Sequence, residues 1–379
     1  MTAETRHEES TAIVGTLFMA LELGSTTWKV AFATTRPMRP RVRSLRAGDL
    51  ALLMAEIGRA KQRLGLPADA SVRSCYEAGR DGLWVHRALV AAGVANVVID
   101  PASIMVDRRA RRAKTDRLDA TALVIQLMNA AAGDRRGWRE LHVPSEQAEA
   151  DRQLQREWET VRVDRTRVRV RIEELVATQG VRLPITPHFA ADVQTVRTWA
   201  GRPLAAELVA RLQREWEHLQ QIEARRTQLE ELRSARVAAD RTDLVAQQTR
   251  ALATLRGIGV NGALTMVTEL FAWRAFRNGR QVGAIVGLTP TPYRSDQTAF
   301  EQGISRSGNR RGRAISIELA WCWVRWQPNS PLTRWFVTRF AHHRRARRIG
   351  IVAVARKLLV ALWRYLETKA LPEGAVVKA

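Results

Sequence analysis

The first third of the chain alternates between short apolar runs and amphipathic stretches. Apolar runs at residues 17–23 and 28–33, and a shorter one around Val42, read as strands joined by turns. Further along, stretches with apolar residues three and four apart alternate with more short runs. We expect strands at 17–23, 28–33, around 42, 71–77 and 96–99, and helices at 50–64, 83–92 and 116–128. This order is typical of a ribonuclease H-like (RuvC-like) α/β fold, a mixed sheet covered by helices.

The rest of the chain has a different pattern. Leucines and valines lie three and four apart over 161–176 and 204–232, with an interruption at 180–187, which predicts a helical hairpin or coiled coil. Glycine, proline and arginine clusters then surround short helices. We therefore expect a disordered lead-in at 1–15, the α/β domain at 16–143, a helical coiled-coil connector at 144–250 and a mainly α C-terminal domain at 251–379. The connector would be a spacer that can also dimerise.

The charge of the chain changes this picture by indicating a partner. A net charge of +23 and a pI near 11.4 favour a polyanion, with nucleic acid ahead of an anionic membrane surface. The most apolar late stretch, 349–366, is interrupted by Arg356, Lys357 and Arg364, which predicts an amphipathic or buried helix and no membrane span.

The N-terminus and the cysteines suggest the compartment. Glutamates stand where a signal peptide would have its basic region. Cys75 and Cys322 are far apart in sequence, and we expect both to stay reduced in a cytoplasmic protein.

Four carboxylates are the first candidate site. Glu22 lies near the end of the first predicted strand, Glu77 ends the fourth, and Asp116 and Asp119 share one face of the last predicted helix because they are three residues apart. Each acid alone could be a solvated residue or a helix cap. Together they could hold two Mg²⁺ ions, which prefer oxygen ligands and can stabilise both oxygens of a phosphoryl transfer.

A second candidate site lies in the C-terminal block. Residues 255–263 begin Leu-Arg-Gly-Ile-Gly and resemble a helix-hairpin-helix turn, in which Gly257 and Gly259 would let backbone amides approach a phosphate; the alternative is a plain turn. A serine beside arginines could attack a phosphodiester. Ser295 is our choice, although composition alone leaves Ser305, Ser307 and Tyr293 open.

Several cations near these elements could bind a nucleic acid. The candidates are Lys114, Arg117, Arg294, Arg306, Arg310 and Arg311. For Arg313 we expect a solvated or phosphate-positioning role without catalysis.

These residues resemble a known family. Residues 114–120, Lys-Thr-Asp-Arg-Leu-Asp-Ala, and 307–311, Ser-Gly-Asn-Arg-Arg, are the most specific segments, and both end blocks match in the same order. Together they resemble the DEDD-type transposases and site-specific invertases of the Piv and IS110 type. Two positions depart from the family's usual pattern: the first acid is Glu22 where aspartate is common, and Asp296 follows the serine where glycine is common.

The resemblance implies an insertion-sequence recombinase. It assigns the metal-binding acids to Glu22, Glu77, Asp116 and Asp119 and the nucleophile to Ser295. It also implies Mg²⁺, a transient phosphoserine link to DNA, a structured bridge RNA, and a homo-oligomer of two to four subunits with a composite active site. Two other functions remain open: a RuvC-like nuclease that uses water, and a nucleic-acid-binding protein that has lost catalysis.

Overall fold

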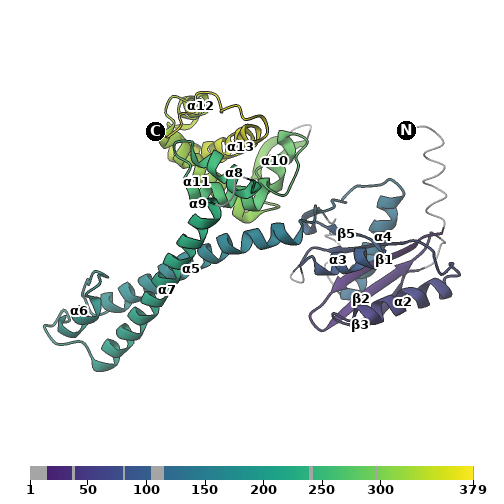
Figure 1. The fold of residues 1–379 in the computed structure, drawn as a ribbon, viewed down its shortest axis with the longest axis horizontal. Coiled ribbons are helices and arrows are strands. Elements are labelled where there is room, and N and C mark those ends of the chain that lie inside the picture. Colours follow the sequence, from purple (N-terminus) through teal and green to yellow (C-terminus); the bar gives the residue numbers. More distant parts are fainter. Residues whose placement is uncertain are drawn as a thin grey trace. The chain divides into compact units, whose positions relative to one another are not determined.

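The structure is a computed structural model and is divided into two compact units (Figure 1). It describes residues 15–35, 39–79, 82–103, 115–238, 242–295 and 298–378; residues 102, 292–295 and 298–302 are described by their backbone alone. The division falls between Val143 and Pro144. The predicted lead-in at 1–15 and Lys114 lie outside the described residues, except for Gly15.

The first unit is built on a five-stranded mixed sheet with the order β3-β2-β1-β4-β5. Strands β1, β2 and β3 are antiparallel neighbours, whereas β1, β4 and β5 run parallel. The strands are β1 (Leu17–Leu23), β2 (Thr27–Ala33), β3 (Arg41–Arg46), β4 (Val72–Glu77) and β5 (Ala95–Ile99), and the short helix η1 (Pro101–Ser103) follows. The helices are α2 (Leu50–Arg63), α3 (Trp84–Ala91) and α4 (Asp116–Ala131). The predicted mixed α/β domain is confirmed, with each predicted strand and helix in place.

Alternation along β1 separates two cores on the two faces of this sheet. Leu17, Met19 and Leu21 face one core, which also contains buried residues of α2 and α3. Phe18 and Ala20 face the other, where Ala120, Leu123 and Val124 of α4 pack. Helix α4 therefore covers the face opposite α2 and α3.

The second unit begins with a long antiparallel helical hairpin. Helices α5 (Glu146–Ala177) and α7 (Ala206–Ala238) are joined through α6 (Phe189–Thr195), and the interruption predicted at 180–187 falls in the non-helical segment between α5 and α6. Their direction follows from the ion pairs Arg171–Glu215, Arg165–Glu223 and Arg225–Glu157, in which one number rises as the other falls. The apolar stripe is buried within the chain: Val161, Val168, Ile172 and Val176 pack with Leu212, Leu219, Ile222 and Leu229.

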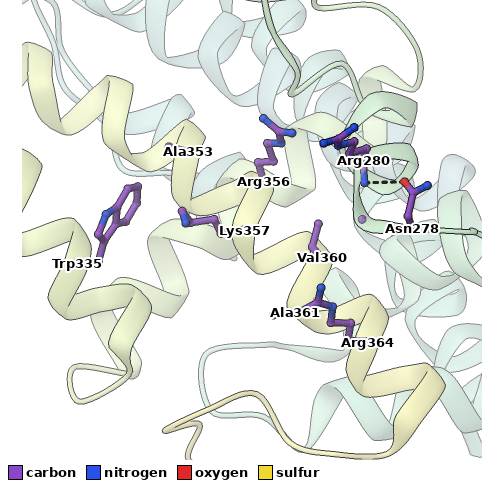
Figure 2. Close-up of a pocket in the computed structure, with 10 residues that line it drawn as sticks. Asn278, Arg280, Trp335, Ala353, Arg356, Lys357, Val360, Ala361 and Arg364 are labelled. Carbon is purple, nitrogen blue, oxygen red and sulfur yellow. Dashed lines mark hydrogen bonds between the residues drawn. The ribbon is translucent and has the colours of Figure 1, made fainter.

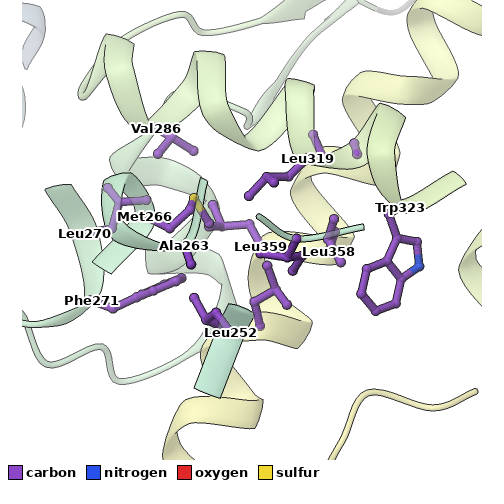
Figure 3. Close-up of a cluster of buried hydrophobic side chains, with 14 of the residues drawn as sticks. Leu252, Ala263, Met266, Leu270, Phe271, Val286, Leu319, Trp323, Leu358 and Leu359 are labelled. Carbon is purple, nitrogen blue, oxygen red and sulfur yellow. The ribbon is translucent and has the colours of Figure 1, made fainter. Parts of the chain in front are cut away.

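The remaining elements form a helical core interrupted by one hairpin. They are α8 (Leu244–Ala253), α9 (Val260–Met266), the π-helix η2 (Val267–Phe271), α10 (Gly279–Ile285), β6 (Pro290–Ser295), β7 (Thr298–Ile304), α11 (Arg310–Trp326), α12 (Pro331–Phe340) and α13 (Arg344–Thr368). Figure 3 shows Leu252, Met266, Leu319 and Leu358 meeting in the centre of this core.

Two features of this part differ from the sequence prediction. The β6–β7 hairpin was not expected, because prolines at 290 and 292 disfavour a strand; a two-stranded ladder tolerates them since each strand is an edge. Helix α11, at 17 residues, is also longer than the short helices that we expected. Glycines and arginines interrupt the apolar pattern of this segment. Packing against the tertiary core nevertheless stabilises the helix.

Helix α13 contains the late apolar stretch and behaves as predicted. Val354, Ala355, Leu358 and Leu362 are buried against the C-terminal core, and Lys357 and Arg364 are exposed. Within the described ranges, no helix is both long and apolar enough to cross a membrane. Both cysteines are free thiols, and Cys75 is fully buried.

The helical hairpin gives a direct test of its buried stripe. Ile172 is fully buried, whereas Val170, two residues earlier on α5, is 43% exposed. We expect Ile172→Ala to lower the free energy of unfolding by about 2–5 kcal/mol, and Val170→Ala to change it by less than about 0.5 kcal/mol. Urea unfolding followed by circular dichroism measures both; equal losses would contradict the buried stripe.

Candidate functional site

The two strand acids lie next to each other in the N-terminal sheet. Leu21 of β1 pairs with Tyr76 of β4 in parallel register, so the following residues, Glu22 and Glu77, are neighbours at the same strand ends. Side chains two residues apart share a face, and the preceding Ala20 and Cys75 belong to the core under α4. Glu22 is half-buried and Glu77 is exposed on this face.

The two helix acids lie in the first turn of α4, where the Thr115 side chain accepts a hydrogen bond from the backbone N–H of Leu118. Asp116 and Asp119 precede Ala120 and Leu123 by one turn, so they extend the stripe of α4 that faces the sheet. Acids in a first turn are also stabilised by the helix dipole, which gives them a structural role that needs no metal.

Helix α4 crosses the sheet from the β3 side toward β4. Arg117 lines a pocket of about 440 Å³ with Arg41 and Arg43 of β3, so the helix begins on the β3 side. The Cys75 thiol of β4 then donates to the backbone carbonyl of Leu123 at 3.8 Å. Among the described residues, no three His, Cys, Asp or Glu side chains gather as a group that could hold a metal ion. The joint metal site therefore stays a prediction that rests on the two pairs.

The predicted helix-hairpin-helix segment forms a helix, a turn and a helix. Gly257 has a φ of +88°, and a Cβ there would lie 3.0 Å from the backbone carbonyl oxygen of Cys322 on α11. Packing against α11 thus requires this glycine. Gly259 is the N-cap of α9, with open space around it. Phosphate binding by the turn stays a prediction.

The serines and arginines of the C-terminal block lie on the β6–β7 hairpin, in the loop after it and in the first turn of α11. Ser295 is the last residue of β6 and pairs with Thr298, and Arg294 pairs with Ala299. In the loop, the Ser305 and Ser307 hydroxyls are 3.1 Å apart. Arg306 and Arg310 are exposed. The hairpin thus contains the candidate nucleophile, and two exposed cations follow the hairpin in the sequence.

The loop after β7 is fixed closely to the segment that follows α10. The backbone N–H groups of Ser305, Arg306 and Asn309 donate to the carbonyls of Thr289, Gly287 and Ile285. Gly287 and Gly308 both have positive φ, and a Cβ on either would collide with backbone of the facing segment. Arg306 itself adopts a φ of 56°, unusual for a residue with a side chain.

Arg313 holds the same loop. Its guanidinium donates to the backbone carbonyls of Val286, Arg306 and Ser307 at 2.9–3.2 Å. Burial, together with the nearby charges of Arg310 and Arg306, lowers the pKa of this guanidinium. One nitrogen of Arg313, Nη1, therefore holds the backbone of the loop, and a phosphate-positioning role for the rest of the guanidinium stays a prediction.

Sequence reasoning missed the central polar group of this region, Glu269. Its side chain is 1% exposed and lies on the π-helix η2. Arg156 of α5 donates to its two carboxylate oxygens at 2.7 and 2.9 Å, and the Asn309 amide donates to Oε2 at 2.9 Å. Burial would raise the pKa of Glu269, but the hydrogen bonds from Arg156 and Asn309 outweigh it and hold this pKa below its usual range.

Asn309 joins this carboxylate to the motif at 307–311. Its side-chain oxygen accepts from the backbone N–H of Gly312 at 2.8 Å and so caps α11, while its amide nitrogen holds Glu269. Arg311, a predicted nucleic-acid contact, pairs with Glu159 of α5 at 2.9 Å. Asn309 and Arg311 of the motif thus fix α11 to η2 and α5.

The same attachment continues along α5. Gln155 is 3% exposed and donates to the Thr265 hydroxyl at 2.8 Å while it accepts from Arg233 at 2.9 Å. The Arg233 guanidinium also lies 4.2 Å from the centre of the Trp158 ring. A glutamate inside the apolar run 266–271 was the available sequence signal, because a charge there needs a buried partner.

Comparison with known proteins identifies the class. Residues 249–333, from α8 to the start of α12, match the family model described as Transposase IS116/IS110/IS902 family. The Sinorhizobium fredii protein y4rJ, a transposase by its name, is 36% identical over 396 residues, which cover all of this chain and 99% of that protein. A second S. fredii protein named as a transposase, y4qE, is 28% identical over 251 residues, covering 65% of this chain and 57% of that protein.

An α/β domain with paired acids, joined to a basic helical unit, is therefore the architecture of a transposase. The chain belongs to the IS116/IS110/IS902 family, and its activity is insertion-sequence transposition. The expected kinship with IS110-type transposases is confirmed at this level.

The double role of Asn309 can be separated by one substitution. Asn309→Asp keeps a good N-cap but places a second carboxylate beside buried Glu269, so we expect a loss of about 2–4 kcal/mol in the free energy of unfolding. The matched control is Asn278→Asp, since Asn278 caps α10 through the backbone N–H groups of Arg280 and Gln281. We expect that control to stay within about 0.5 kcal/mol. Equal urea midpoints for the two variants would mean that the contact with Glu269 contributes nothing.

The lowered pKa of Glu269 predicts a pH dependence. Its stabilising effect is complete above the unfolded glutamate pKa, about 4.3, and is lost as the pH falls through the lower folded pKa. We expect Glu269→Gln to be less stable than the wild type by about 1–3 kcal/mol at pH 7, with a difference that stays constant down to about pH 5 and narrows below it. Urea midpoints at constant ionic strength measure the gap, and a gap independent of pH would contradict an ionised Glu269.

Proposed function

We propose that this transposase cuts and rejoins DNA through a phosphoserine intermediate at Ser295, with Mg²⁺ held by acids of a ribonuclease H-like domain. The observation that carries the proposal is the adjacency of Glu22 and Glu77 at two parallel strand ends, on the sheet face that α4 covers. Asp116 and Asp119 lie on the sheet-facing stripe of that helix. An all-carboxylate donor set suits Mg²⁺, which when bound would neutralise charge on the scissile phosphate.

The proposed covalent step balances without a further reactant. The Ser295 hydroxyl oxygen forms a bond to phosphorus, the bond from phosphorus to a deoxyribose oxygen breaks, and the hydroxyl proton leaves to solvent while the released oxygen is protonated. Attack by a DNA hydroxyl reverses these changes and frees the serine. The phosphodiester energy is kept in the link, so no ATP is needed. Exposed Arg306 and Arg310 would stabilise the charge on the phosphate.

A structured guide RNA and a homo-oligomer are further parts of this proposal. Both rest on the resemblance to the IS110-type family, and the net charge of +23 suits a second nucleic acid besides DNA. The apolar stripes of α5 and α7 are buried against each other within one chain, so contacts between subunits would use other surfaces of that hairpin.

The second candidate is a RuvC-like nuclease that hydrolyses DNA with water. The adjacent strand acids favour it equally, since hydrolysis needs the acids alone. The basic C-terminal unit, with Ser295 on its β6–β7 hairpin, favours the recombinase, because a hydrolytic nuclease does not need a serine nucleophile.

Covalent capture tests the proposal. Purified protein, Mg²⁺, the noncoding RNA that flanks the gene and DNA spanning the element junction are combined and resolved on a denaturing gel. We expect a protein-linked DNA band in the wild type that disappears in Ser295→Ala, because the proposed link is a bond from the Ser295 oxygen to phosphorus. We also expect Glu77→Gln to lose the band.

The controls identify the nucleophile. Ser305→Ala, Ser307→Ala and Tyr293→Phe should keep the band, since each removes one alternative hydroxyl. Free cleaved DNA without any linked protein would establish the nuclease, and a band that persists in Ser295→Ala would assign the nucleophile elsewhere.

A further inference from the structure

A basic pocket lies between α10, α12 and α13 (Figure 2). It has a volume of about 850 Å³, and its wall includes four cations: Arg280, Arg356, Lys357 and Arg364. The last three belong to one stripe of α13, because they are separated by one, seven and eight residues. No carboxylate lines the pocket, and among the described residues none of the four cations forms an ion pair.

Two of these cations are positioned by packing. A Cβ on Gly279 would lie 2.8 Å from Val360, and one on Gly283 would lie 3.2 Å from the Arg356 guanidinium, so two glycines of α10 let α13 come close. Lys357 lies with its Nζ 4.9 Å from the centre of the Trp335 ring. Figure 2 shows Lys357 directed toward Trp335, with Arg356 and Arg280 at the same end of the pocket. Arg356 and Lys357 are therefore held in place before a ligand arrives.

The surrounding sequence is strongly basic. Between residues 303 and 366 the chain has fourteen lysines and arginines and a single acid, Glu318. Arginines also occupy the first turns of α13, where the helix dipole disfavours cations. Such an excess lowers the stability of the free protein by self-repulsion and favours a polyanion as the partner.

We propose that this pocket binds the sugar-phosphate backbone of duplex DNA. The proposal rests on the proposed function, and the pocket contains none of the residues to which we assign the chemical step. Lys357 and Arg364 are two turns apart on α13, about 10 Å, which spans roughly three phosphate steps of one DNA strand along the axis. Lys357 covers one face of the Trp335 ring, so this tryptophan orients a cation toward the pocket. The pocket therefore holds phosphates independently of sequence and positions the DNA.

The test is the binding of the protein to a DNA duplex of about 30 bp and random sequence, measured as a function of salt concentration. The variant is Arg280→Gln, Lys357→Gln and Arg364→Gln together. We expect its affinity to fall about 10–100-fold near 0.1 M salt, and the slope of log K against log salt to become shallower by about 2–3, close to one per lost phosphate contact. Fluorescence anisotropy over a salt series gives both values.

A matched variant removes the same charge elsewhere. The three residues are Arg182, Arg211 and Arg214, and all are exposed. Arg182 lies in the connection between α5 and α6, and the other two lie near the start of α7. Their triple change to Gln should leave affinity within about 2-fold and the slope unchanged. Equal losses of DNA affinity in both variants would mean that only net charge matters, and would overturn the proposed DNA contact. A pocket variant that binds an RNA hairpin more weakly but keeps its DNA affinity would also overturn it.

The outcome is separate from that of covalent capture. A wild type that binds DNA with the expected difference between variants, yet forms no protein-linked band, would remove the phosphoserine chemistry and leave the pocket standing. A linked band with equal binding by the wild type and the pocket variant would do the reverse.

Discussion

The C-terminal half of this transposase depends on one buried carboxylate. A charge removed from water is costly unless hydrogen bonds and an opposite charge compensate it. Glu269 receives both, from the Arg156 guanidinium and the Asn309 amide, which come from elements far apart in sequence. Because the carboxylate cannot be left unpaired, α5, the π-helix η2 and the start of α11 must keep one relative placement.

That constraint explains the composition of the motif at 307–311. Gly308 permits backbone contact with the segment after α10, Asn309 caps α11 and holds Glu269, and Arg311 reaches Glu159. Exposed Arg306 and Arg310 are left for a ligand. The family match covers residues 249–333, and therefore includes Glu269 and Asn309 but not Arg156. The long helix α5 thus completes a network that the matched segment could not satisfy alone.

The arginines of the chain divide into two kinds by their surroundings. Arg156, Arg233 and Arg313 are structural, since carboxylates, amides and backbone carbonyls use their donors. Arg280, Arg356 and Arg364 line an open pocket without a carboxylate. Composition shows only the sum of the two kinds, and that sum supports binding of a polyanion without saying where it binds.

The sequence by itself determined the mixed α/β order of the first unit, the helical hairpin and the burial of α13, because apolar periodicity reports local structure and its buried face directly. It also singled out Glu22 and Glu77, whose adjacency follows from strand order. Only the tertiary structure decided that α4 starts on the β3 side, that Arg313 clamps a loop, that residues 290–304 form a hairpin and that Glu269 joins Arg156 to Asn309. These depend on contacts between residues as many as 113 positions apart, and no local pattern encodes which distant partner will satisfy a buried charge.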